Sequence, residues 1–103
     1  MNFEIRKNEA LSRFEISVDG EFGGFAEYKV TGKVMALPHT VVEPKFGGKG
    51  VGGALVAYAL EEARSNGLTV APYCSFVAKV ISKENERYGE LVSPEFFHLL
   101  PSK

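Results

Sequence analysis

The chain has 103 residues, 45% hydrophobic and 24% charged, and this composition predicts one globular domain over residues 1–103. Its formal charge is -1 with acids and bases mixed along the sequence, which excludes the basic surface typical of nucleic-acid binding. The single cysteine, Cys74, excludes an internal disulfide and a cysteine-cluster metal site. No apolar run approaches the roughly 20 residues of a membrane span, and the first residues carry charges, so a cytoplasmic protein without membrane contact is expected.

The first third of the chain predicts antiparallel strands. A short strand is expected over residues 3–7, and residues 13–18 alternate between apolar and polar side chains. Asp19-Gly20 suits a tight type I′ turn, because both central residues of that turn need positive φ. The returning strand is expected over residues 21–30, with a bulge at Gly23-Gly24.

Residues 34–42 predict a central strand with a defect. Polarity hardly alternates along this stretch, which indicates a strand covered on both faces. Pro38 lies inside it and cannot donate to a neighbouring strand, so the strand needs a bulge or an unpaired neighbour there.

The second half of the chain predicts helices around one buried strand. A four-residue repeat of apolar side chains begins at Val51 and indicates a helix that ends at Asn66-Gly67. "LTVAPYC" is typical of a buried strand, after which Ser75 is expected to cap a second helix. A last short helix is predicted from Ser93, with Pro94 in its first position. This order predicts an α+β fold with a mixed, mostly antiparallel sheet covered by two to three helices.

Between the central strand and the first helix lies "KFGGKGVGG", in which five glycines surround Lys49. The first N–H groups of a helix lack partners and carry the positive end of the helix dipole. A glycine loop that leads into a helix therefore lets backbone donors surround a pyrophosphate, and the lysine adds a cation. The alternative is a glycine-rich turn that only allows a helix and a sheet to pack closely.

Two other phosphate-binding motifs do not fit this loop. A Walker A loop needs Gly-Lys-Ser/Thr, whereas Lys49 is followed by Gly50. Gly48, Gly50 and Gly53 have the G-x-G-x-x-G spacing of a dinucleotide site, but the segment "VAPYC" lacks the acidic residue that such a site requires.

The stretch "VVEPKFGGKGVGGALVAYALEEARSNGL" resembles the acetyl-CoA-binding motif of the GNAT superfamily of N-acetyltransferases, Q/R-x-x-G-x-G/A between a strand and a helix. Gly47-x-x-Gly50-x-Gly52 matches it, except that Gly47 stands where the family usually has Arg or Gln. "GKVMALPHTVVEP" and "VAPYCSFVAKVI" are similar to segments of the short single-domain (mini-GNAT) branch, which lacks the usual N-terminal helices. The resemblance covers roughly residues 13–92.

The resemblance implies a site for coenzyme A or acetyl-CoA. In GNAT-like folds the strand before the glycines and the next strand separate, and pantetheine pairs with the free backbone groups between them. Val41 and Val42 are the residues expected to pair with pantetheine. The pyrophosphate is expected to contact a loop of seven residues: Gly47, Gly48, Lys49, Gly50, Val51, Gly52 and Gly53.

The resemblance also implies direct acyl transfer to an amine, and His39 and Cys74 are the candidate catalytic residues. His39 can titrate near neutral pH and act as a base, and Cys74 lies before a helix N-terminus, where a thiol is activated. The two side chains are expected to be able to meet across the cleft. Cys74 is a nucleophile, a general acid for the departing thiolate, or a buried core residue, and these alternatives stay open.

The predicted function is therefore an acetyl-CoA-dependent N-acetyltransferase with a small-molecule or peptide amine as acceptor. The alternative is a non-catalytic module that binds CoA or acyl-CoA or another protein, because without the missing helices nothing in the chain clearly forms an amine pocket. A monomer or weak homodimer is expected, in which a protein partner could complete that pocket.

Overall fold

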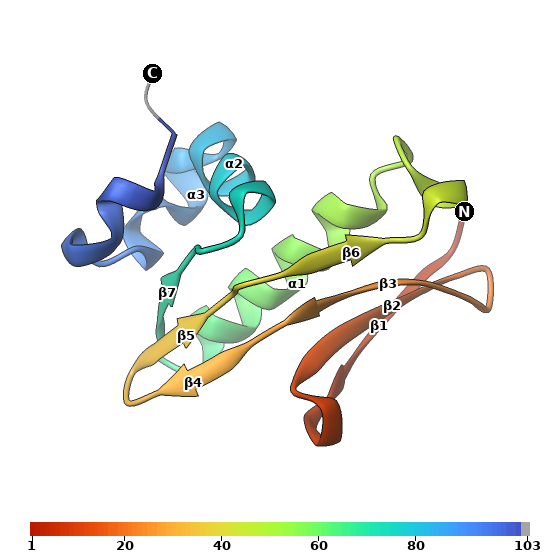
Figure 1. Ribbon diagram of the computed structural model, residues 1–103, viewed down its shortest axis with the longest axis horizontal. Helices are drawn as coiled ribbons and strands as arrows, with labels where there is room; N and C mark the ends of the chain where they lie inside the picture. Colours follow the sequence, from red (N-terminus) through yellow and green to blue (C-terminus); the bar gives the residue numbers. More distant parts are fainter. Residues whose placement is uncertain (102–103) are drawn as a thin grey trace.

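The computed structural model describes residues 1–101, which contain seven strands in two sheets and three α-helices (Figure 1). The larger sheet has the order β1-β2-β3-β6 and is antiparallel. The smaller sheet has the order β4-β5-β7 and mixes an antiparallel with a parallel pair. The predicted α+β class is confirmed.

The larger sheet contains the predicted hairpin. This sheet is built from β1 (Phe3–Asn8), β2 (Arg13–Val18), β3 (Glu21–Glu27) and β6 (Thr40–Val42). Asp19 and Gly20 have φ values of 50° and 84° in the turn between β2 and β3, as a type I′ turn requires. The predicted bulge is also present: Ile16 pairs with Gly24 and Ser17 with Phe22, so that Gly23 is the extra residue.

Two predicted strands are each divided between the sheets. The returning strand ends at Glu27, because β2 offers no partner before Arg13, and the chain resumes as β4 (Lys29–Thr31) in the smaller sheet. The predicted central strand is interrupted at residues 37–39, around Pro38, between β5 (Val34–Ala36) and β6. Only β5 pairs with β7 (Thr69–Ala71), in parallel, so β6 moves away from β7.

The helices surround the point where the strands separate. α1 (Val51–Ser65) lies across one face of the sheets, and α2 (Ser75–Lys83) and α3 (Asn85–Tyr88) follow β7 (Figure 1). The prediction of Ser75 as N-cap was wrong: the cap position is Cys74, which makes no side-chain capping bond. The last predicted helix is a 3-10 helix, Pro94–Leu99, with Ser93 at its N-cap.

The core lies between α1 and the strands. Its largest fully buried side chains come from β2, β5, the interruption after β5, α1, β7, α2 and α3: Phe14, Ile16, Val18, Met35, Leu37, Val51, Leu55, Val56, Leu60, Val70, Ile81 and Tyr88. Burial of a large apolar side chain contributes about 1.5–3 kcal/mol each, which holds α1 against the sheets. Among the described residues, no helix has both the length and the apolar character to cross a bilayer.

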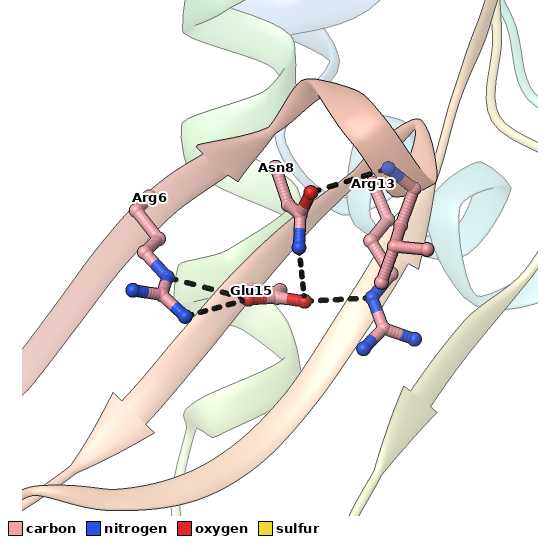
Figure 2. A network of polar contacts seen from close by, with 5 residues as sticks. Arg6, Asn8, Arg13 and Glu15 are labelled. Atoms are coloured by element: carbon pink, nitrogen blue, oxygen red, sulfur yellow. Dashed lines mark hydrogen bonds and ion pairs between the residues drawn. The ribbon is translucent and has the colours of Figure 1, made fainter.

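The face of the larger sheet opposite α1 carries a buried carboxylate. Glu15 is only 6% exposed and accepts hydrogen bonds from Arg13 Nε at 2.8 Å, Asn8 Nδ2 at 3.0 Å and Arg6 Nη2 at 3.2 Å (Figure 2). The bond from Arg13 is the main reason that the pKa of Glu15 lies below its ordinary value, with Asn8 and Arg6 adding to the effect against the opposing effect of burial. The network ties β1 to β2.

Glu15→Gln is expected to lower the free energy of unfolding by about 1–3 kcal/mol, because two guanidinium groups lose their anionic acceptor. Since the pKa of Glu15 is lowered by folding, the ionised carboxylate stabilises the fold above the ordinary glutamate pKa. This stabilisation is lost as the pH falls through the lower, folded-state value. Urea unfolding between pH 7 and pH 3 should therefore show a smaller loss with acid in Glu15→Gln. Glu4→Gln, at an exposed position of β1, is the control, and equal curves for the two variants would contradict the prediction.

Candidate coenzyme A site

The glycine loop is anchored at one residue and open along the rest. After β6, the 3-10 helix Pro44–Phe46 places the Phe46 ring in the core, and Gly47 to Gly50 are exposed. Gly48 and Gly50 have φ values of 75° and 82°, which L-residues rarely adopt. A Cβ atom at either position would meet no atom within 4 Å, so packing does not require these glycines. The positive φ values of the turn favour glycine at both positions, and the space above the turn is open.

The loop and the first turn of α1 present unpartnered amide groups. In the loop and the first turn of α1, the backbone N–H groups of five residues have no acceptor among the described residues: Gly48, Gly50, Val51, Gly52 and Gly53. They gather at the N-terminus of a 15-residue helix, where the helix dipole favours an anion. Lys49 is exposed beside them and forms no ion pair with a described residue. This arrangement fits a pyrophosphate.

Gly47 differs from its neighbours. Its φ of -60° is open to any residue, and a Cβ atom there would come no closer than 3.3 Å to its nearest neighbour, the Pro44 carbonyl oxygen. The Arg or Gln that the family motif usually has at this position is therefore not excluded by the backbone conformation. Without it, anion binding depends on backbone donors and Lys49.

A cavity of about 560 Å³ extends from the loop along β6. It is lined by residues of β6, the glycine loop, the first turn of α1 and α2: Thr40, Val42, Phe46, Gly47, Gly48, Gly50, Val51, Gly52, Gly53 and Phe76. Phe76 packs closely over Gly52, because a Cβ atom at Gly52 would lie 2.9 Å from the Phe76 ring and 3.2 Å from Val42 Cγ2, so that the ring would have to move. Gly52 thus permits close packing, whereas Gly48 and Gly50 shape the loop.

One edge of β6 has no strand beside it in the part of the chain that the structure describes. Hydrogen bonds from Glu43 N to the Gly23 carbonyl and from Glu27 N to the His39 carbonyl fix the antiparallel register with β3. In this register the peptide groups of Val41 pair with β3, and those of Thr40 and Val42 point to the open edge. The prediction of free backbone groups is supported for Val42. The prediction was wrong for Val41, whose peptide groups pair with β3, and the free groups belong to Thr40.

Cys74 lies where β6 and β7 separate. Its backbone N–H donates to the Leu37 carbonyl at 3.0 Å, which fixes the residue at the start of α2. The thiol is partly buried and its sulfur lies 3.6 Å from Thr40 Oγ1. Thr40 lines the cavity, whereas Cys74 contacts Thr40 but does not itself line the cavity.

His39 lies on the other face of β6. Its side chain is exposed, and its ring centroid is 6.2 Å from that of Phe25, across the sheet from Thr40. Consecutive residues of a strand point to opposite faces, and Thr40 points toward Cys74. The structure thus does not bring His39 and Cys74 together. Sequence reasoning missed Thr40 and Phe76 as site residues, although strand alternation next to His39 could have identified Thr40.

Comparison with known proteins gives the family. The family model described as GCN5-related N-acetyl-transferase matches residues 13–91. The chain belongs to this family, and the resemblance found in the sequence, including its extent, is confirmed.

Solved structures agree with the family and its fold. A GCN5-like putative N-acetyltransferase from Staphylococcus aureus is 29% identical with a TM-score of 0.64, over 87% of each chain. Ard1 from Thermoplasma volcanium is 26% identical with a TM-score of 0.52, over 57% of this chain and 41% of its own. N-acetylglutamate synthase from Neisseria gonorrhoeae, solved with coenzyme A and N-acetyl-glutamate, is 23% identical with a TM-score of 0.53, over 63% of this chain and 17% of its own. The chain thus spans less than half the length of the last two proteins.

Proposed function

We propose that this protein binds acetyl-CoA and transfers the acetyl group to an amine. The observation that carries the proposal is one continuous cavity with unpartnered helix N-terminal amides at one end and a free strand edge along its side. The amides of residues 48 and 50–53 and the Lys49 ammonium bind the pyrophosphate. The peptide groups of Thr40 and Val42 pair with the pantetheine amides.

Acetyl-CoA supplies an activated acyl group as a thioester. The protein orients that group at the end of the cavity that Thr40 lines. There the Thr40 hydroxyl also contacts the Cys74 thiol. His39, on the uncovered face, accepts the proton that an approaching amine must lose. The amine therefore approaches from the His39 side and passes the free edge of β6 to reach the acyl carbon.

The proposed acceptor is a small-molecule or peptide amine. We also propose a cytoplasmic location, consistent with a single unpaired cysteine, and a monomer or weak homodimer. The second candidate function is a CoA-binding module without catalysis. It is favoured by one observation, that neither His39 nor Cys74 lines the cavity.

Release of free CoA from acetyl-CoA should separate the two functions. We expect release to depend on protein concentration and to increase when spermidine, phenylethylamine or a peptide with a free N-terminus is added separately. The acetylated amine should appear by mass spectrometry in equal amount. Coenzyme A that raises the melting temperature while no acceptor gives turnover would favour the binding module. Equal stabilisation by CoA, NAD and ATP would contradict the CoA site itself.

A further inference from the structure

Thr40 lies at the meeting point of three features that the sequence does not connect. Its peptide groups face the open edge of β6, its side chain lines the cavity, and its hydroxyl oxygen contacts the Cys74 sulfur at 3.6 Å. A thiol and a hydroxyl can each donate or accept, and with the Cys74 S–H as donor Thr40 Oγ1 accepts in this contact.

The hydroxyl of Thr40 keeps its own hydrogen for another partner. A hydroxyl has one donor and two acceptor sites, and within residues 1–101 the contact with Cys74 is the only side-chain hydrogen bond of Thr40. When the thiol donates to an acceptor site of Thr40 Oγ1, the hydroxyl hydrogen is free to rotate toward the cavity. Cys74 itself does not line the cavity, so any proton that it supplies to a group there needs a carrier.

We infer that Thr40 and Cys74 form a proton relay to the sulfur of the acyl donor, which makes Thr40 a catalytic residue and Cys74 the acid behind it. The inference rests on the proposed acetyl transfer. As the amine nitrogen bonds to the acyl carbon, the bond from that carbon to sulfur breaks and its electron pair stays on sulfur. The sulfur takes the proton of Thr40 Oγ1, and Thr40 Oγ1 takes the proton of Cys74 Sγ. Cys74 is left as a thiolate that solvent reprotonates, and the proton lost by the amine goes to His39.

The relay gives Cys74 the role of an acid and not of a nucleophile. A nucleophilic Cys74 would have to reach an acyl carbon inside a cavity that it does not line. The relay uses the contact that the structure contains and requires that the thioester sulfur lie beside Thr40. It also explains why a threonine, whose hydroxyl can accept and donate at once, occupies this position next to the thiol.

Thr40→Val keeps the side-chain shape and the backbone groups but removes the hydroxyl, and Thr40→Ser keeps the hydroxyl. With acetyl-CoA and spermidine as probes, we expect Thr40→Val to lower kcat about a hundredfold, within the range of general acid effects, with KM for acetyl-CoA unchanged. Thr40→Ser should retain most of kcat. In a relay, the double variant Thr40→Val with Cys74→Ala should lose no more of kcat than either single variant. If the two residues acted independently, the two reductions of kcat would multiply. Thr31→Val, an exposed threonine of β4, is the control.

A second readout needs no acyl donor. Loss of the acceptor for its S–H should change the rate at which Cys74 reacts with iodoacetamide, and we expect a severalfold faster reaction in Thr40→Val and an unchanged rate in Thr40→Ser. Equal losses of kcat in the Val and Ser variants, multiplying losses in the double variant, or wild-type kcat in Thr40→Val would each overturn the relay. Wild-type protein without any turnover would overturn the proposed transfer as well, and unchanged alkylation in Thr40→Val would remove the contact on which the relay depends.

Discussion

Replacing Gly50 by valine is expected to abolish the rise in melting temperature that CoA and acetyl-CoA give the wild-type protein. At a ligand concentration of about 100 Kd, binding to the native state alone contributes about 2.7 kcal/mol. For a domain of this length that corresponds to an increase on the order of 10 °C. Valine at position 50 would fill the open space above the loop and disfavour the φ of 82° that directs the neighbouring amides outward. The phosphates would then lose both room and donors.

Backbone strain alone has to be separated from loss of the site. Gly67 provides a matched control, because its φ is 68°, a Cβ atom there would also meet nothing within 4 Å, and it lies past the other end of α1. Gly67→Val should lower the melting temperature of the free protein and keep the ligand-induced rise. Lys49→Ala should reduce the rise and its dependence on salt without removing it. A full rise in Gly50→Val would show that the ligand binds elsewhere.

His39→Ala is expected to lower acetyl transfer about a hundred- to ten-thousandfold, the range of general acid-base effects. The base must be neutral to accept the amine proton, so wild-type turnover should rise with pH and then level off. The variant should lose this rise. Binding of CoA should be retained, because the proposed contacts are the backbone groups at the free edge of β6 and the amides and lysine of the glycine loop.

The chain offers a control for this change as well. Its other histidine, His98, is exposed in the C-terminal 3-10 helix and makes no contact with the cavity. His98→Ala should leave turnover and its pH profile unchanged. A His39→Ala protein with the wild-type pH profile would eliminate His39 as the base and leave an acceptor-derived or solvent base.

The predictable part of the fold is the part that local residue patterns determine. The hairpin follows from Asp19-Gly20, the bulge from two adjacent glycines, and α1 from a four-residue apolar repeat with a glycine after it. The division of two predicted strands between the sheets could not be predicted in this way, because it depends on where a neighbouring strand begins and ends. Nothing around Tyr28 shows that β2 begins at Arg13, so the end of β3 depends on a distant segment.

The glycine loop of the candidate site was predictable from the sequence, whereas the free groups of β6 and the positions of the side chains were less so. Glycine spacing before a helix identified the loop, since the physics of a helix N-terminus is local. Which peptide groups of β6 are free depends on its register with β3, and a shift of one residue exchanges Val41 for Thr40. The same alternation separates His39 from Cys74, and a sequence shows it only when the boundaries of the strand are known.

The shortness of β6 has a consequence for the protein without ligand. An unpaired strand edge is a template on which another chain can add a strand and start aggregation. β6 has three residues, and only Thr40 and Val42 turn their peptide groups outward. Pro38 on one side and the 3-10 helix Pro44–Phe46 on the other prevent the edge from growing longer. The edge is thus long enough for the few amides of a slender ligand and too short for a foreign strand, which lets the protein keep it exposed.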